Sequence, residues 1–464
     1  MSGHASCPST ARRRPDWTAM ELTGEQASAF ARANAELAAS VASERVAAKR
    51  EKIERMLGFD REAGEERLNR LLRHAVARVP FYRDGPSAFS DFPLVGKADL
   101  RDRFFDFLSR GPDGRMEPGT YFLNQTSGST GEPVRILATV ETGGMANAVI
   151  LERINRHLGV EDGGITLNVG LLYERTPMFE PVALPSPTVK CNLRGFDPGS
   201  PGIVADYAAT VGRFPVEKIT GSSSRVIALA RYCAERGITL RPKAIIATYE
   251  HMPDSGRALV EETFGRKVTM LYATSETGYS AWECSRGRLH FQDDLVRPEI
   301  VPDDGAGGGG IVLTHLLSTP MPIIRYVTGD RAAAPVPCDC GLPGTAIEQL
   351  LGRARTSLVG AGHELYSPFA LMAALVAAGL PDYQIVQEAP GLLDLIVPPS
   401  WSGADETVRD INARLALSFR PREGFRLRAR PSGAFVLTES GKRNPVVQLL
   451  DLPSVPERTG YLKS

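Results

Sequence analysis

Residues 224–271 alternate between two kinds of segment, and this alternation decides the fold class. The stretches SRVIALARYCAER (224–236) and DSGRALVEETF (254–264) have the apolar spacing that is typical of helices. Each precedes a short apolar run, KAIIA (243–247) or KVTML (267–271). A similar run, GITLNVG, occupies residues 164–170. Helices that alternate with short buried strands predict an α/β fold with a largely buried sheet.

The chain on either side of this stretch predicts a large body and a small C-terminal lid. Residues 24–57 and 61–79 have helical patterns, and Pro80 ends the second. The glycine run at 305–310 predicts a turn between strands, because glycine tolerates positive φ. The last hundred residues alternate helices and strands, which predicts a small α+β sandwich. We divide the chain into a disordered tail (1–20), a large domain (21–352) and a mobile lid (353–464).

Composition excludes several classes of protein. The 464 residues carry 54 Lys+Arg and 54 Asp+Glu, so the formal net charge is zero, whereas dedicated nucleic-acid binders are usually strongly basic. No apolar run approaches the ~18–20 residues of a membrane span, and no apolar segment follows the polar N-terminus as in a signal peptide. Six cysteines are too few for a disulfide framework. We therefore expect a cytoplasmic protein without nucleic-acid or membrane partners.

A loop rich in glycine and hydroxyl side chains is the first candidate for a ligand site. Residues 126–133 read TSGSTGEP. The glycines let a phosphate approach the backbone closely, and the N–H and hydroxyl groups can donate to its oxygens. The loop lacks the lysine of a Walker motif. By composition alone, a flexible turn is an equal alternative.

Further motifs follow this loop along the chain. They read LYATSETG at 271–278, TGDR at 328–331, GR at 352–353 and SGK at 440–442. In this order and spacing they resemble the adenylate-forming superfamily, which includes acyl-CoA ligases, carrier-protein adenylation domains and luciferases. The segments LLRHAVARVPFY (71–82), FPLVGKADL (92–100) and 243–264 are most similar to the phenylacetate–coenzyme A ligase family. The resemblance covers residue 70 to the C-terminus, and it implies a large α/β body with a small mobile α+β lid.

The resemblance implies an AMP-forming acid ligase. Such an enzyme activates a carboxylic acid with ATP and magnesium as an acyl-adenylate, releases pyrophosphate, and transfers the acyl group to coenzyme A. Because an anion attacks a polyphosphate, the site must supply cations and N–H donors. Serines and tyrosines near 169–179 and 220–225 favour a polar aromatic acid, such as a hydroxylated or aminated one. Two alternatives remain: an amine, a hydroxyl or a carrier-protein thiol, with the carrier acting in trans, as acceptor; and a non-catalytic nucleotide-binding protein.

Each motif then has an implied role. The residues that would hold the phosphates are Thr126, Ser127, Gly128, Ser129, Thr130 and Gly131. Those that would line the rest of the nucleotide pocket are Tyr249, Glu250, Tyr272, Thr274 and Ser275. Glu276 would bind Mg²⁺, and Asp330 would accept both ribose hydroxyls. Arg353 and Lys442 would be catalytic, and the flexible ammonium of Lys442 would reach the carboxylate and the α-phosphate from the lid.

The motifs depart from the family pattern at two places. Relatives often carry a lysine shortly after the glycine-rich loop, where this chain has Val134. Most relatives also carry two aspartates after the Gly-Arg pair, and the first is the usual hinge of the lid. This chain has Arg355 and Thr356 there. Hinge residues need only absorb a φ/ψ change, so rotation of the lid is still expected.

Two short pairs of soft ligands predict a metal site. Cys284 and His290 form one pair, and Cys338 and Cys340 form the other. Their number and type suit tetrahedral zinc, and some members of the resembled family carry such a structural zinc. The alternative is two free cysteines on a turn and an unrelated buried cysteine. The remaining cysteines, Cys7, Cys191 and Cys233, lack such neighbours and are expected to be packing or tail residues.

Overall fold

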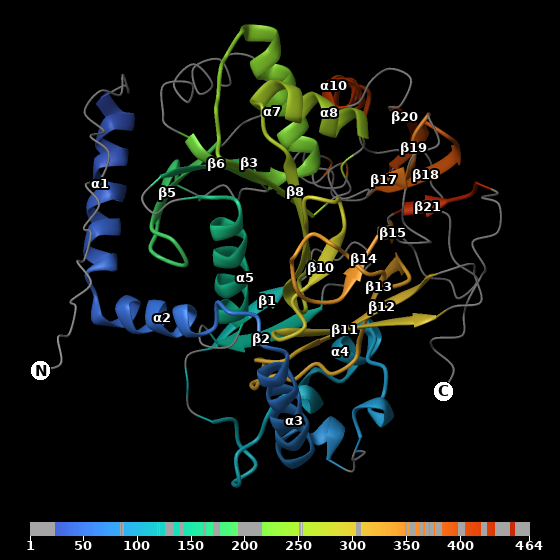
Figure 1. Ribbon diagram of the computed structural model, residues 1–464. Helices are drawn as coiled ribbons and strands as arrows, with labels where there is room; N and C mark the ends of the chain where they lie inside the picture. Colours follow the sequence, from blue (N-terminus) through green and yellow to red (C-terminus); the bar gives the residue numbers. More distant parts are fainter. Residues whose placement is uncertain are drawn as a thin grey trace, which may run out of the picture.

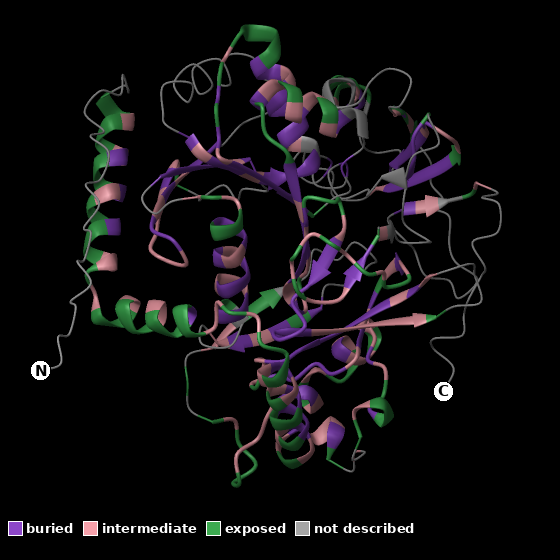
Figure 2. Ribbon diagram, viewed as in Figure 1, coloured by how far each residue is buried: buried purple, intermediate pink, exposed green. Residues whose placement is uncertain are grey.

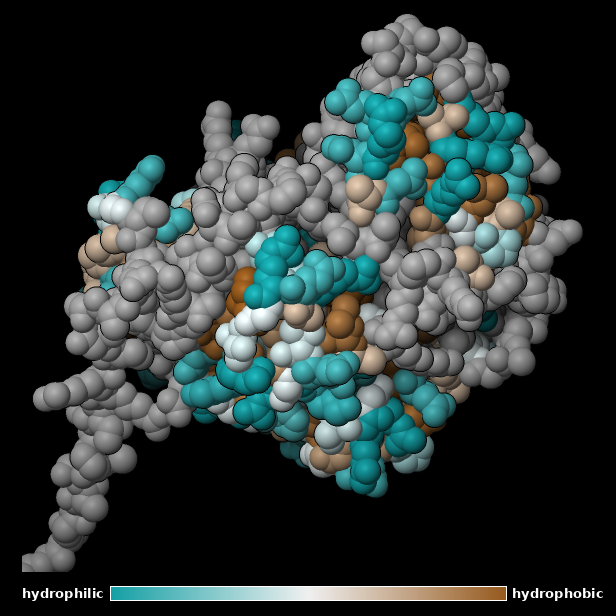
Figure 3. Space-filling model, turned by 90° about the horizontal axis from the view of Figure 1, so that it is seen from above, coloured by the Kyte–Doolittle hydropathy of each residue, from teal (hydrophilic) through white to brown (hydrophobic). Residues whose placement is uncertain are grey.

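The computed structural model describes residues 24–450 with internal gaps. The gaps are 84, 86–87, 118, 120, 126–133, 140–142, 161–163, 170–176, 194–215, 250–251, 253, 303–307, 349, 353–357, 362–364, 367–370, 372–374, 376–382, 398–403, 419–424 and 432–445. No helix in the described residues is long and apolar enough to cross a membrane. On the face seen in Figure 3, the described residues are mostly hydrophilic, with small groups of apolar atoms between them.

Among the described residues, nine strands form the central sheet (Figure 1). In spatial order they are β14 (Ala346–Ile347), β10 (Leu289–Phe291), β9 (Gly278–Glu283), β8 (Val268–Thr274), β7 (Ala244–Thr248), β6 (Val216–Ser222), β3 (Ile165–Val169), β5 (Thr188–Asn192) and β4 (Phe179–Val182). Strands β5, β3, β6, β7 and β8 are parallel, and the strands at both edges run antiparallel to their neighbours. The predicted α/β fold with a large buried sheet is confirmed.

Helices cover both faces of this sheet. Successive side chains of a strand point to opposite faces. On β7, Ile245 packs in the core that contains α7 (Ser223–Arg236) and α8 (Asp254–Phe264), whereas Ile246 packs in the core that contains α5 (Gly143–His157). The strands are buried on both sides, which explains the continuous apolar runs of the sequence. The two helices predicted at 224–236 and 254–264 are confirmed almost to the residue.

The N-terminal helices are also confirmed. They are α1 (Gly24–Val41), α2 (Glu44–Arg55) and α3 (Arg61–Arg78), and α3 ends just before Pro80. Helix α1 packs on β4 and β5 through Phe30, whose ring meets Phe179 edge-to-face with the centroids 5.2 Å apart. Figure 2 shows buried positions on one side of α1 and exposed positions on the other. Because β4 is the last strand of the sheet, α1 closes the core at that edge.

A second sheet lies beside the first and is antiparallel. Among the described residues its strands are β11 (Val296–Pro302), β12 (Gly308–His315), β13 (Tyr326–Ala333) and β15 (Leu350–Gly352). The predicted turn at 305–310 is partly wrong, because residues 308–310 belong to β12; residues 303–307 lie outside the described part. A Cβ on Gly309 would stand 2.2 Å from the Val301 carbonyl oxygen, so the strand pair needs a glycine there.

The segment before residue 110 is joined to β13. It contains η2 (Pro80–Tyr82), η3 (Phe89–Asp91), α4 (Lys97–Asp102) and η4 (Phe104–Phe107). The Val95 N–H donates to the Arg325 carbonyl at 3.0 Å, and the Val327 N–H donates to the Val95 carbonyl at 2.9 Å. The Tyr82 hydroxyl accepts a hydrogen bond from the Ile324 N–H at 3.1 Å. These contacts hold the start of α4 beside β13.

The C-terminal residues have a sheet and an apolar core of their own. The described strands are β20 (Arg426–Pro431), β19 (Leu392–Val397), β18 (Gln384–Ala389) and β21 (Val446–Gln448), and α10 (Ala404–Ser418) packs on β20. The hairpin of β16 (Leu358–Val359) and β17 (Leu365–Tyr366) joins this core through Leu358. The Gln387 side-chain amide donates to the Val359 carbonyl at 2.6 Å and accepts from the Val359 N–H at 2.7 Å. Thus β15 belongs to the second sheet, whereas β16 is attached to the C-terminal sheet.

Candidate functional site

Several predicted site residues lie outside the described part of the chain. They are Thr126, Ser127, Gly128, Ser129, Thr130, Gly131, Glu250, Arg353 and Lys442. The strands on either side of the glycine-rich segment are described: β1 (Tyr121–Gln125) precedes it and β2 (Arg135–Thr139) follows it. These strands pair antiparallel from Gln125 opposite Arg135 to Tyr121 opposite Thr139. The glycine-rich segment thus lies between two paired strands in the sequence.

Two predicted carboxylates lie between the central and the second sheet, and each accepts a hydrogen bond from a tyrosine. Glu276 lies in the turn between β8 and β9, and its side chain is 5% exposed. The Tyr326 hydroxyl, on β13, donates to Glu276 Oε1 at 2.6 Å. A second hydrogen bond runs from the central sheet to the second sheet: the Tyr272 hydroxyl on β8 donates to Asp330 Oδ2, on β13, at 2.9 Å. This reciprocal pairing brings Glu276, Tyr272 and Asp330 together.

The turn that carries Glu276 is shaped by its neighbours. The Thr277 N–H donates to Thr274 Oγ1 at 3.0 Å, and Gly278 follows with a φ of 72°. A Cβ on Gly278 would stand 2.4 Å from Asn147 Oδ1, which accepts the Tyr279 N–H at 2.8 Å. Only glycine meets both demands without strain. Thr274 is thus a turn-forming residue here, and the predicted Ser275 is exposed beside Glu276.

Tyr249 directly follows β7 and is an exposed aromatic residue near the site. It is 58% exposed, and its backbone φ of 72° is rare for a residue with a side chain. The Tyr249 side chain is therefore not packed in the core. Burial raises the pKa of the nearby Tyr279 hydroxyl to about 12, and the Tyr249 hydroxyl adds to this shift. An exposed aromatic ring beside a site offers a face for stacking.

Lys97, which our sequence analysis did not assign to the site, lies beside Glu276. Its Nζ is 3.8 Å from Glu276 Oε1, within ion-pair distance. Asp330 lies on the same strand as Tyr326, and its N–H donates to Thr328 Oγ1 at 3.0 Å. The only sequence signal for Lys97 was its place in FPLVGKADL, which identified a resemblance but not a role. The structure thus adds a cation to an otherwise acidic site.

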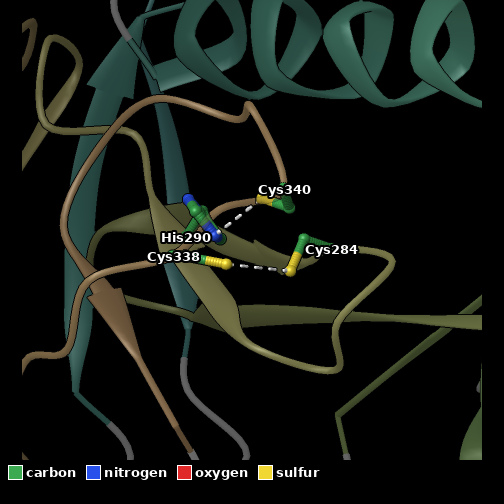
Figure 4. A group of neighbouring side chains, drawn as sticks. All are labelled: Cys284, His290, Cys338 and Cys340. Carbon is green, nitrogen blue, oxygen red and sulfur yellow. Dashed lines mark hydrogen bonds between the residues drawn. The ribbon is translucent and has the colours of Figure 1, made fainter.

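The predicted soft ligands also come together among the described residues (Figure 4). Their ligand atoms, from Cys284, His290, Cys338 and Cys340, all lie within 4.8 Å of one another. Cys284 Sγ and Cys338 Sγ are 3.8 Å apart, and Cys340 Sγ is 3.3 Å from His290 Nε2. The other predictions for cysteines are confirmed where they can be compared, because Cys191 and Cys233 are buried in the apolar core.

The surroundings of these four side chains prepare them to bind a metal. His290 Nδ1 lies 3.1 Å from the Pro343 carbonyl, so a proton held on Nδ1 leaves Nε2 facing the sulfur atoms. Backbone N–H groups donate to Cys284 Sγ and Cys340 Sγ from two residues downstream, both at 3.3 Å. Burial acts to raise the pKa of the Cys338 thiol, but hydrogen bonds from the Cys340 backbone and from His290, Cys340 and Arg288 lower it to about 6.

No family model matches this chain. It is 27% identical over 450 residues to the phenylacetate–coenzyme A ligase of Thermus thermophilus, an alignment that covers 83% of this chain and 95% of that protein. A crystal structure of 2-hydroxyisobutyryl-CoA ligase with 2-HIB-AMP and CoA, in the thioesterification state, matches 83% of this chain and 89% of its own with a TM-score of 0.54 and 19% identity. With the motif order and the fold, these findings confirm the resemblance of this chain to the adenylate-forming acyl-CoA ligase superfamily.

Proposed function

We propose that this chain activates an aromatic carboxylic acid with ATP and transfers the acyl group to coenzyme A. The reciprocal tyrosine–carboxylate pairs carry the proposal, because they join Glu276, in the turn after β8, and Asp330, on β13, to tyrosines of the facing sheet. Asp330 offers two oxygens to the adjacent hydroxyls of a ribose. Glu276 offers an anionic oxygen to a hard divalent cation that accompanies ATP. The exposed ring of Tyr249 offers a stacking face to the adenine.

The remaining roles in this proposal come from the motifs outside the described residues. The loop at 126–131 holds the β- and γ-phosphates, and Glu250 lines the adenine pocket. Arg353 precedes the hinge, and Lys442 reaches the carboxylate and α-phosphate from the C-terminal domain. In the reaction, a carboxylate oxygen attacks the α-phosphorus, the bond to the bridging oxygen breaks, and pyrophosphate leaves. The acceptor thiol then attacks the acyl carbon. AMP leaves together with the carboxylate oxygen that attacked the α-phosphorus.

The domain boundary in this proposal lies between Gly352 and Leu358. Gly352 ends β15, which pairs with β13, whereas Leu358 packs in the C-terminal core. A lid that begins at 353 would therefore turn about a short connection. The change of two usual aspartates to Arg355 and Thr356 lies within that connection. This departure keeps a second candidate function open, in which an amine, a hydroxyl or a carrier-protein thiol acts as acceptor.

The substrate class is proposed from the relative in Thermus thermophilus, whose name specifies an aromatic acid. The test is acid-dependent pyrophosphate release from ATP and magnesium, measured across a panel of aromatic and aliphatic acids with and without coenzyme A. We expect AMP and pyrophosphate, the fastest release with an aromatic acid, and thioester formation when coenzyme A is present. Release of ADP and phosphate would contradict acid adenylation. Adenylation without thioester would favour the second candidate acceptor.

Replacing Glu276 by glutamine should weaken the use of magnesium–ATP. The amide keeps the shape and still accepts from Tyr326, but it loses the anionic oxygen that a hard cation prefers. We expect the KM for magnesium–ATP to rise by about 10–100-fold, on the scale of one interaction with a charged group. Glu54→Gln is the matched control, because Glu54 pairs with Arg156 on the surface, 48% exposed. Wild-type kinetics for Glu276→Gln would remove Glu276 from the metal site.

We also propose that the four soft ligands hold a structural zinc. Three thiols and one imidazole are the donor set of closed tetrahedral sites. The atoms already converge, and the Pro343 carbonyl sets the imidazole tautomer that directs Nε2 toward the sulfur atoms. Cys284 follows β9 and His290 lies on β10, whereas the other two come from the turn before β14, so zinc would tie this edge of the central sheet together.

A further inference from the structure

An ion pair joins the two turns that carry the soft ligands. Arg286 lies in the hairpin of β9 and β10, between the two ligands of the first pair, and Asp339 is the residue between Cys338 and Cys340. Arg286 Nε donates to Asp339 Oδ1 and Arg286 Nη2 donates to Asp339 Oδ2, both at 3.1 Å. The guanidinium thus binds both oxygens of one carboxylate, which fixes direction as well as charge. The pair connects segments that are 53 positions apart in the sequence.

A second arginine of the same hairpin also reaches the other turn. Arg288 Nη1 donates at 2.6 Å to the carbonyl of Pro337, the residue before the first thiol of that turn. The hairpin itself is closed by its backbone. The Cys284 N–H donates to the Arg288 carbonyl at 2.8 Å, and the Gly287 N–H donates to the Cys284 carbonyl at 2.9 Å. Both arginines therefore extend from a fixed turn to the segment that carries the other two thiols.

The exposure of the ion pair separates its effect on the ligands from its effect on the fold. The side chains of Arg286 and Asp339 are 60% and 72% exposed. An ion pair this exposed adds little to the stability of a whole domain. It can still hold together two turns that touch through few other side chains. Its charge also suits the centre, because three thiolates and one Zn²⁺ leave one uncompensated negative charge beside Arg286 and Arg288.

We propose that Arg286 and Asp339 form a clamp that holds the two ligand pairs together and slows the release of zinc. The inference rests on the zinc site proposed above. A metal ion leaves a four-ligand site by losing its ligands in turn, and a ligand that has let go rebinds quickly when its segment stays close to the metal. The closed clamp keeps each turn in place during such an event. Arg286 and Asp339 are thus positioning residues that do not bind the metal themselves.

The test measures how fast zinc leaves the protein. Zinc-loaded protein is mixed with an excess of a chelator that changes colour when it binds zinc. Arg286→Gln and Asp339→Asn each open the clamp, and the double variant Arg286→Asp, Asp339→Arg rebuilds it with the charges exchanged. Arg101→Gln is the matched control, because Arg101 also binds both oxygens of a surface carboxylate, that of Asp102.

We expect zinc to leave either single variant about 10-fold faster, on the scale of one interaction with a charged group. The double variant should recover most of the loss, and Arg101→Gln should match the wild type. The melting temperature of the zinc-loaded protein should stay close to the wild-type value in every variant. Replacement of zinc by cobalt should give the same visible spectrum in Asp339→Asn as in the wild type, since the ligands do not change.

Several results would overturn the clamp. Unchanged release from both single variants would do so, as would faster release from Arg286→Gln alone, which would leave only an effect of charge. A large fall in the melting temperature of the zinc-loaded variants would assign the pair to the fold, and an altered cobalt spectrum in Asp339→Asn would make Asp339 a ligand. Wild-type protein that takes up no zinc would contradict the zinc site itself, whereas zinc that leaves at a rate independent of the ion pair would contradict only the clamp.

Discussion

An alanine at position 442 should slow acyl-adenylate formation by about 10²–10³-fold, the usual cost of losing one electrostatic donor to a transition state. By its SGK motif, Lys442 is the lysine that we propose to act on the reacting carboxylate and the α-phosphate. Its charge matters most while negative charge redistributes in the transition state. The rate of adenylation should therefore fall much more than the affinity for ATP. The measurement is acid-dependent pyrophosphate release at saturating ATP.

The second half-reaction separates this role from a structural one. When pre-formed acyl-adenylate is supplied, Lys442→Ala should transfer the acyl group to its acceptor at nearly the wild-type rate, because in this proposal the lysine acts only in the first half-reaction. Lys267→Ala is the control, since Lys267 is 91% exposed and pairs with Glu261 on the surface. Equal losses in both half-reactions would assign Lys442 to the fold. No loss in either would make the SGK resemblance accidental.

Replacing Cys338 by serine should remove zinc and lower stability together. The wild type should contain about one zinc per chain, as in other four-ligand structural sites. A hydroxyl binds zinc much more weakly than a thiolate, and structural zinc binding is coupled to folding. We expect the metal content of Cys338→Ser to fall close to zero and its melting temperature to drop by several degrees. Elemental analysis and thermal unfolding measure the two effects on the same sample.

Cys233→Ala is the matched control for this experiment. Cys233 is a buried thiol in α7, far along the chain from the four ligands, and it packs in the apolar core. Its loss should lower stability through a small cavity while leaving zinc in place. A chelator should lower the melting temperature of the wild type but not that of Cys338→Ser. Wild-type protein that is free of metal and equally stable would show that these thiols do not form a zinc site.

Much of the fold follows from local patterns. The helices α7 and α8 and the strands β7 and β8 could be predicted because their apolar periodicity is set by burial on both faces of one sheet. The second sheet could not be predicted. Its strand β12 begins with the three glycines 308–310, which read as a turn, and its pairing with β11 depends on a close approach to Val301. The glycines carry no side chains, so this part of the strand has no apolar alternation from which to predict it.

The site could be predicted only in part, because some of its contacts join segments that are distant in the sequence. Glu276 and Asp330 were identified through short motifs, and the four soft ligands through their types and spacing. The partners of the carboxylates could not be identified, because Tyr326 lies outside the TGDR motif and Lys97 lies far before Glu276 along the chain. Both contacts result from the packing of α4 and β13 against the turn after β8. Only the three-dimensional arrangement reveals them.

The position of α1 has a consequence for how fragments of this protein behave. The helix covers Phe179 on β4, the last strand of the central sheet, and buries Phe30 and Leu37 against it. A chain that began after Val41 would keep every motif of the site but would present an apolar surface beside an unpaired strand edge. Such edges pair with other chains. Recombinant versions trimmed to the motif-bearing region should therefore self-associate, so expression experiments should retain the residues from Gly24 onward.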